Sequence, residues 1–231
     1  MIDLEQQLAK AKSDAERAKL CLKAVKQKPW GFAELKRVPE KFKTAEMCLI
    51  AVKQRGDALE DVPEKFKTAK LCLEAVKNGF ALEYVPEKLK TEEMCLIAVK
   101  QDGLILEYVP KKLKTAKICL EAVKQSGYAL NFVPKKLKTT KICLEAVKNY
   151  GVILKYVPEK LKTAEMCLET VKQCGGWIII VPEKFKTVEL CLEAIKKWDG
   201  LDNVFKYVPE SIRDKVKKAA GIKPSKQEKG K

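Results

Sequence analysis

The sequence predicts an all-α protein, an α-solenoid of about seven 24-residue helical repeats with atypical units at both ends. The first observation is a Val-Pro pair that recurs in steps of 23 to 27 residues, beginning at residues 38, 62, 85, 109, 133, 157, 181 and 208. The second is the phrase "VPEKLKTAEMCLE" (157–169), which returns in nearly the same form in each period. Such a unit is too short for a domain but suits two helical pieces and two turns, so neighbouring units must stack.

The longer piece of each repeat is predicted to be an α-helix, as "TAEMCLIAVKQRG" (44–56) illustrates. Thr44 is a good N-cap, because its hydroxyl accepts a hydrogen bond from a backbone N–H that has no partner inside the helix. Gly56 is expected to end the helix in the left-handed conformation. Helical spacing joins four residues between these ends into one apolar face, Met47, Cys48, Ala51 and Val52. The same start recurs at Thr68, Thr91, Thr115, Thr139, Thr163 and Thr187, and the same stop at Gly79, Gly103, Gly127, Gly151, Gly175 or Gly176, and Gly200.

The shorter piece, "DALEDVPEKFK" (57–67), keeps only a rough helical spacing. Pro63 has no N–H to donate, and it pushes Val62 out of helical geometry. We therefore expect a short helix, a break at Val-Pro, and one tight turn that leads into the next threonine cap.

The two ends of the chain differ from the internal repeats. Residues 1–37 are predicted to form an N-terminal helical cap, in which Leu4 and Leu8 share one face and Ser13 with Glu16 forms a capping box. Residues 38–207 form the tandem repeats, and residues 208–221 a closing helix that ends at Gly221. Residues 222–231 are expected to be a disordered basic tail. The loops of the two terminal repeats are longer and carry Trp30 and Trp198.

Nine cysteines would suggest disulfides in a small secreted chain, but their placement favours a different interpretation. Helices that stack side by side are about 8–10 Å apart, which is too far for a regular disulfide ladder. We therefore predict small, buried thiols in a reducing compartment, with Cys174 as the one cysteine outside the repeat phase. The eight cysteines in phase are Cys21, Cys48, Cys72, Cys95, Cys119, Cys143, Cys167 and Cys191.

Nothing in the sequence suggests a membrane or a secretory route. The apolar run Trp177–Val181 is far too short to span a bilayer. The start, "MIDLEQQLAKAK", lacks the basic, apolar and small-residue order of a signal peptide. A cytoplasmic protein is the expectation.

The pattern "ALEYVPEKLKTEEMCLIAVKQDG" (81–103) resembles an α-helical repeat family known as domain of unknown function 4116. That family also joins an "ALxY" segment to a long helix that carries "AVKQ" or "AVKN" and a glycine. The resemblance covers nearly all of residues 13–215 and implies helical repeats. It implies no activity and no site residues.

Residue types that enzymes depend on are missing from the sequence. The chain contains no histidine, so it has no ordinary proton shuttle, no Ser-His or Cys-His pair and no histidine metal ligand. Its glycines follow helices and form no phosphate loop. We therefore expect a non-enzymatic protein without a cofactor, a metal or a small-molecule substrate.

Charge separates the two central repeats from the others. The chain has a net charge of +16, with 43 Lys and 4 Arg. Residues 109–132 contain five Lys and one Glu, and residues 133–156 contain six Lys and one Glu. Lysines are expected to project from one edge of the stack as a basic strip, which suits a phosphate backbone or an acidic partner. These candidates are Lys111, Lys112, Lys114, Lys117, Lys135, Lys136, Lys138 and Lys141.

Aromatic residues near the basic strip support nucleic-acid binding only weakly. Tyr108, Phe132 and Tyr156 share a regular slot with Tyr84 and Tyr207, which indicates packing. Sequence-reading sites also recruit arginine, which is scarce here. Solubility is therefore an alternative explanation of the lysines.

A second difference between repeats is apolar. Ile179 stands where the other repeats have polar residues, and with Trp177 and Cys174 it suggests an exposed patch that another protein covers. Extra packing is the alternative. The slot after the helix-ending glycine varies between repeats, and packing back on the helix is its favoured interpretation. The residues in this slot are Asp57, Phe80, Leu104, Tyr128, Val152, Trp177 and Leu201.

Two functional hypotheses follow. The first is a protein–protein interaction module with Trp177 and Ile179 at the contact. The second is a nucleic-acid binder that uses the basic strip.

Overall fold

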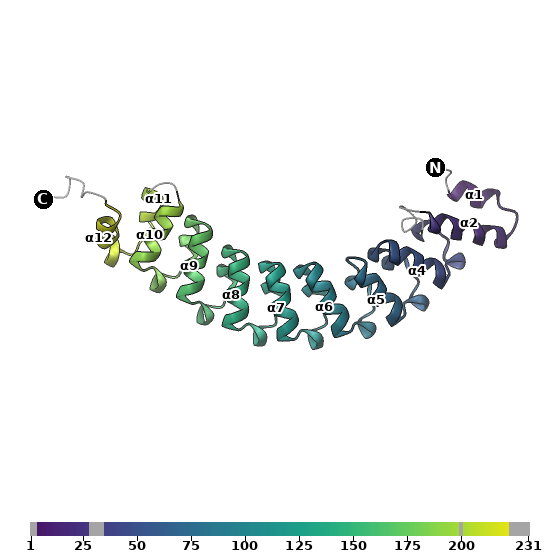
Figure 1. The fold of residues 1–231 in the computed structure, drawn as a ribbon, viewed down its shortest axis with the longest axis horizontal. Coiled ribbons are helices and arrows are strands. Elements are labelled where there is room, and N and C mark those ends of the chain that lie inside the picture. The colour runs from purple at the N-terminus through teal and green to yellow at the C-terminus, as the bar shows by residue number, and fades with distance from the viewer. Residues whose placement is uncertain (1–3, 28–34, 199–200, 222–231) are drawn as a thin grey trace. The chain divides into compact units, whose positions relative to one another are not determined.

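The computed structural model describes residues 4–27, 35–198 and 201–221 (Figure 1). The chain divides into two compact units, residues 1–125 and residues 126–231. Every regular element in the described residues is an α-helix or a 3₁₀ helix, and the same short unit returns along the chain. The predicted all-α repeat fold is therefore confirmed.

The first unit begins with two α-helices, α1 (Leu4–Lys10) and α2 (Asp14–Lys26). Its repeats then alternate α-helices with short 3₁₀ helices: η1 (Glu40–Phe42), α4 (Ala45–Gln54), η2 (Gly56–Asp61), η3 (Glu64–Phe66), α5 (Ala69–Lys77), η4 (Leu82–Tyr84), η5 (Glu87–Leu89), α6 (Glu92–Gln101), η6 (Gly103–Tyr108), η7 (Lys111–Leu113) and α7 (Ala116–Gln125).

The second unit repeats this order and closes with two further α-helices. Its elements are η8 (Gly127–Phe132), η9 (Lys135–Leu137), α8 (Thr140–Asn149), η10 (Gly151–Tyr156), η11 (Glu159–Leu161), α9 (Ala164–Gln173), η12 (Gly175–Ile180), η13 (Glu183–Phe185), α10 (Val188–Lys197), α11 (Leu201–Phe205) and α12 (Glu210–Ala219).

Each of the helices α4 to α10 begins where its threonine predicts. The Thr44 hydroxyl accepts a hydrogen bond from the Met47 N–H at 3.3 Å, and the six equivalent threonines do the same three residues on. Such a cap is worth about 1 kcal/mol, because it satisfies one of the free N–H groups of the first turn.

The Val-Pro pair breaks the helical path as expected. Val62 is extended, with φ −80° and ψ 124°, and Pro63 then opens the short helix η3 by accepting from the Phe66 N–H at 2.9 Å. The pieces on both sides of the break are 3₁₀ helices, which are tighter than α-helices and suit such short runs.

Within each unit the repeats form two layers. Consecutive α-helices contact one another, and the longer 3₁₀ helices lie against the α-helix before and the α-helix after them. The core between the layers holds the eight predicted cysteines, each with no exposed surface. Burial raises the pKa of the Cys95, Cys167 and Cys191 thiols to about 11, so they stay protonated at neutral pH. All nine cysteines are free thiols.

The glycines after the α-helices do not act as predicted. Among the described residues, only Gly79 and Gly221 have a positive φ, so the left-handed helix stop is wrong for the other repeats. These glycines instead allow neighbouring repeats to approach closely. A Cβ atom on Gly127 would lie 2.5 Å from the Ala146 carbonyl oxygen, and one on Gly175 would lie 2.4 Å from that of Ala194. The predicted stop at Gly200 lies outside the described residues.

An amide side chain at the end of several α-helices joins neighbouring repeats. Gln173 Nε2 donates to the carbonyl oxygens of Val147 and Lys148, both at 3.0 Å, and Gln173 Oε1 accepts from the Gly151 N–H at 2.7 Å. These bonds satisfy groups that a helix end leaves free. Gln54 and Gln101 likewise donate to the preceding repeat, at Val25 and Val76. Sequence reasoning missed this role.

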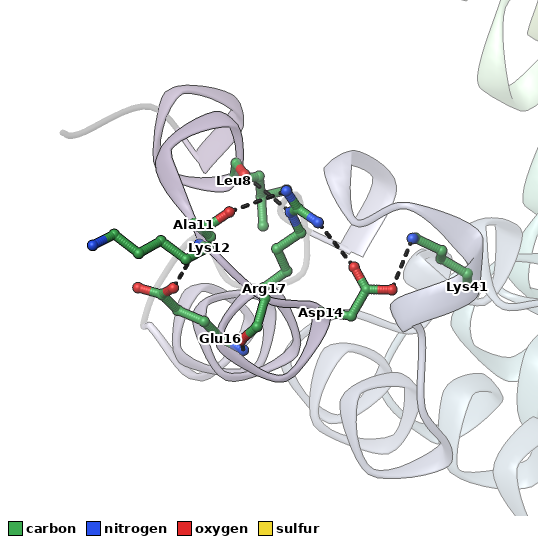
Figure 2. Close-up of polar contacts among 8 residues, drawn as sticks. Leu8, Ala11, Lys12, Asp14, Glu16, Arg17 and Lys41 are labelled. Carbon is green, nitrogen blue, oxygen red and sulfur yellow. Dashed lines mark hydrogen bonds and ion pairs between the residues drawn. The ribbon is translucent and has the colours of Figure 1, made fainter.

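One arginine ties the two helices of the N-terminal cap together, and one aspartate links the cap to the first repeat (Figure 2). Arg17 donates to the carbonyl oxygens of Leu8 and Ala11, at 3.2 and 3.0 Å, near the end of α1. It also pairs with Asp14, whose other carboxylate oxygen accepts from Lys41. Leu4 is buried as predicted.

The predicted capping box at the start of α2 is half correct. Ser13 caps the Glu16 N–H at 3.2 Å. The Glu16 carboxylate, however, accepts from the N–H of Lys12, one residue before the position that the motif predicts.

The C-terminal end agrees with prediction where it is described. Helix α12 covers α10, and Gly221 follows it with φ 71°. The loop with Trp30 and the tail 222–231 lie outside the described residues. The proposed boundaries at residues 37, 207 and 221 stay predictions.

Candidate functional site

An exposed group of aromatic and aliphatic side chains lies on the 3₁₀ layer of the second unit. We call it the aromatic patch, and it consists of Tyr128, Tyr150, Lys155, Tyr156, Trp177 and Ile179. Four of these are exposed although they are large and apolar or aromatic: Tyr128, Tyr150, Tyr156 and Ile179, at 41, 39, 41 and 56%.

Three rings of the aromatic patch form a continuous row across successive repeats. The Tyr128 and Tyr150 ring centroids are 5.4 Å apart, and those of Tyr150 and Trp177 are 5.3 Å apart with an edge-to-face angle of 83°. Edge-to-face pairs of this kind are worth about 0.5–1.5 kcal/mol beyond area burial, so the row is held in place. Desolvation and its hydrogen-bonded neighbour Tyr150 raise the pKa of Tyr128, which therefore stays a neutral phenol.

The backbone below the row explains how Trp177 fits. A Cβ atom on Gly151 would lie 2.8 Å from the Trp177 ring and 3.0 Å from the Thr170 Cα, so only glycine leaves room for the indole. The buried Thr170 hydroxyl donates to the Gly151 carbonyl oxygen at 3.1 Å. Together with the hydrogen bonds of the Gln173 side chain, these contacts hold α9 against the repeat that contains Gly151.

Ile179 and Lys155 complete the aromatic patch. They occupy the same position in η12 and η10, and these two helices contact one another. The Lys155 ammonium lies 4.7 Å from the centre of the Tyr156 ring, a cation–π contact. At the equivalent position, the other repeats have the exposed polar residues Glu60, Glu83, Glu107 and Asn131.

Three sequence-based assignments are wrong. Trp177 does not occupy the slot after the glycine, because η12 begins at Gly175 and Gly176 fills that slot. Trp177 instead matches the buried Ile153 of η10, and it is half-buried. The residue after the glycine was also predicted to pack on the last turn of the preceding helix. This is wrong for Phe80, Leu104 and Tyr128, whose side chains are exposed. Tyr108 and Tyr156 were predicted to be packing residues, but their side chains are 40 and 41% exposed.

Tyr150 was missed by sequence reasoning, although a signal existed. It stands where neighbouring repeats have Asp102, Ser126 and Cys174, so a large aromatic residue is exceptional at this position. Cys174, the cysteine outside the repeat phase, is half-buried at the end of α9.

The predicted lysines fall into two classes. Lys111, Lys112 and Lys117 are exposed in the first unit, and Lys135, Lys136 and Lys141 are exposed in the second. Neither η7 nor η9 contains an acidic residue. A continuous strip of these lysines stays a prediction.

Lys114 and Lys138 do not project as expected, because both are half-buried. Burial lowers the pKa of Lys114. The equivalent Lys90 Nζ donates to the Tyr108 carbonyl oxygen at 2.8 Å, and Lys43 and Lys186 donate to the next repeat in the same way. This lysine position therefore serves the contact between repeats.

Across residues 4–27, 35–198 and 201–221, no three acidic or cysteine side chains gather where they could hold a metal ion. In the same part of the chain, no helix is both long and apolar enough to cross a membrane.

Comparison with known proteins identifies the family. Residues 19–67, 70–114 and 117–162 match the family described as "Domain of unknown function (DUF4116)", and these segments together cover more than half of the chain. The chain belongs to the DUF4116 family. Each matched segment of this DUF4116 protein includes two successive long helices, so one family domain corresponds to two of the 24-residue repeats. No curated protein and no solved structure is significantly similar to it.

Proposed function

We propose that this DUF4116 protein is a non-enzymatic scaffold that binds another protein through the aromatic patch. The observation that carries the proposal is the fixed row Tyr128–Tyr150–Trp177, with the exposed Ile179 two residues after Trp177 in η12. Tyrosine and tryptophan dominate binding energy at protein interfaces, because they bury a large area at a small entropic cost.

The charges around the aromatic patch also favour a protein partner. Helices η8, η10 and η12 contain no acidic residue and one basic residue, Lys155. Interface centres are depleted in charge in this way. The repeat fold supports the proposal, since stacked units present an extended surface.

The proposal places the scaffold in the cytoplasm and requires no cofactor or small-molecule substrate. Eight buried free thiols suit a reducing compartment.

Ile179→Lys is expected to weaken capture of the partner at least about tenfold. The added charge would have to be buried without a counter-ion at the interface centre. The measurement is affinity capture from nuclease-treated lysate, quantified by mass spectrometry, with circular dichroism as the folding check. Asn203→Lys is the matched control, because it adds the same charge at an exposed position of α11 outside the patch. Equal capture by Ile179→Lys and the wild type would contradict the proposal.

Nucleic-acid binding through the exposed lysines is the second candidate function. Its support is the absence of acidic residues from η7 of the first unit and from η9 of the second, so that Lys111 and Lys112, and likewise Lys135 and Lys136, have no acidic neighbour in their own helix. A labelled single-stranded oligonucleotide is expected to bind at low salt and to dissociate as salt rises. Replacing these four lysines by glutamate should make the salt dependence shallower. An oligonucleotide that does not bind at low salt would remove this candidate.

A further inference from the structure

The 3₁₀ layer of the first unit differs in charge from that of the second. Helices η2, η4 and η6 contain five acidic residues and no basic residue, in a chain whose net charge is +16. We define the acidic face as three exposed glutamates and two exposed apolar residues from this region: Glu60, Glu83, Glu107, Phe80 and Leu104.

The glutamates of the acidic face form a row across three repeats. Glu60, Glu83 and Glu107 occupy the same position in successive repeats, and η2 contacts η4 as η4 contacts η6. In the described residues, no ion pair joins any of the three to a lysine or arginine. No close ion pair therefore occupies the row, although Lys90 and Lys114 act electrostatically on Glu83 and Glu107.

Two exposed apolar side chains accompany the glutamates. Leu104 precedes Glu107 by three residues within η6, and residues three apart in a 3₁₀ helix lie on the same side. Phe80 precedes Glu83 by the same interval in the sequence but lies outside η4, which begins at Leu82. Phe80 is 57% exposed and Leu104 is 43% exposed, which leaves a substantial apolar area uncovered.

Tyrosines link the glutamates into one surface. The negative charge of Glu83 is the main cause that raises the pKa of Tyr108, and Glu83 also hydrogen bonds to this side chain. The pKa of Tyr84 is also raised. Desolvation is the largest cause, and the negative charges of Glu83 and Glu60 raise it further. Carboxylates of two successive repeats therefore act on one tyrosine.

The glutamate row and the two apolar side chains match the surface of one kind of partner. Neighbouring helices are about 8–10 Å apart, and seven residues of an α-helix rise about 10.5 Å. A helix that lies across the repeats would place a basic residue near each glutamate and an apolar residue beside it. We propose that the acidic face, within residues 56–108, docks a basic amphipathic helix of a partner protein. This inference uses a different surface from the aromatic patch and does not depend on it.

The test uses the full chain and a fluorescein-labelled helical peptide with leucines on one face and lysines on the adjoining face. We expect saturable binding despite the positive net charge of the protein, and a dissociation constant that rises with salt. The Glu60→Lys/Glu83→Lys/Glu107→Lys variant should bind at least about tenfold more weakly, as expected when like charges replace opposite ones. Phe80→Ser should bind about fivefold more weakly, and this single change keeps the test valid if the triple variant does not fold.

The matched control is Glu40→Lys/Glu64→Lys/Glu87→Lys. These exposed glutamates lie in η1, η3 and η5, and two other repeats already have lysine at this position, Lys111 and Lys135. The control changes net charge by the same amount and should retain binding within about twofold. Equal loss in both triple variants would assign the effect to net charge and overturn the inference. Absence of wild-type binding, or equally tight binding of the same peptide with glutamates for lysines, would also overturn it.

Discussion

Gly175→Ala is expected to lower the free energy of unfolding by about 3 kcal/mol or more. The new Cβ atom would lie 2.4 Å from the Ala194 carbonyl oxygen and 2.8 Å from the Trp198 backbone nitrogen. Both atoms belong to backbone that cannot move without separating α10 from η12, so the overlap exceeds what side-chain adjustment relieves. Urea denaturation followed by circular dichroism measures the change, with the slope m compared between variants.

Gly176→Ala is a control at the adjacent residue. Its Cβ atom would meet the Trp198 ring at 3.5 Å, an ordinary contact, and Gly176 does not have a positive φ. We expect a change within about 1 kcal/mol, in the stabilising direction, because alanine restricts the unfolded chain. If the two substitutions had equal effects, close approach between repeats would not be the reason for Gly175.

Leu154→Ala should have the second-largest effect, a loss of about 2–5 kcal/mol. Leu154 is fully buried in η10, and this helix lies between α8 and α9. Truncating the Leu154 side chain leaves a cavity next to both α8 and α9, and the cavity closes only if both helices move. Because each repeat contacts only its neighbours, we also expect faster hydrogen exchange in α8 and α9 than in α10.

Lys155→Ala tests the same helix without a cavity. Lys155 is exposed, so its loss should change stability by less than about 0.5 kcal/mol. A loss below about 1 kcal/mol for Leu154→Ala would show that the 3₁₀ layer contributes little to the core.

Much of each repeat could be predicted from the sequence, because the interactions involved are local. The Thr44 cap spans three residues, and the break at Val62 depends only on the proline that follows. The buried phase of Cys48 follows from helical spacing. Of the candidate contacts, Ile179 was found because its repeat equivalents are polar, and the structure leaves it exposed.

Features that join one repeat to the next could not be predicted in this way. Gln173 resembles any surface glutamine until its bonds to Val147 and Gly151 are known, and these partners are 26 and 22 residues away. Trp177 was assigned to the wrong slot because two adjacent glycines left the register ambiguous. Tyr150 joins the patch only through rings of the flanking repeats.

The sequence by itself therefore determined the helical period, the caps, the proline breaks and the apolar phase of this protein. Tertiary structure alone decided why glycine stands at positions such as 127 and 175, where Lys114 and its equivalents lie, and which exposed side chains meet on one surface. The physical reason is range. Backbone preferences and helical spacing act within a few residues. The close approach of a glycine to a carbonyl oxygen, the hydrogen bonds of glutamine side chains and the contacts between rings depend instead on where the next repeat places its backbone.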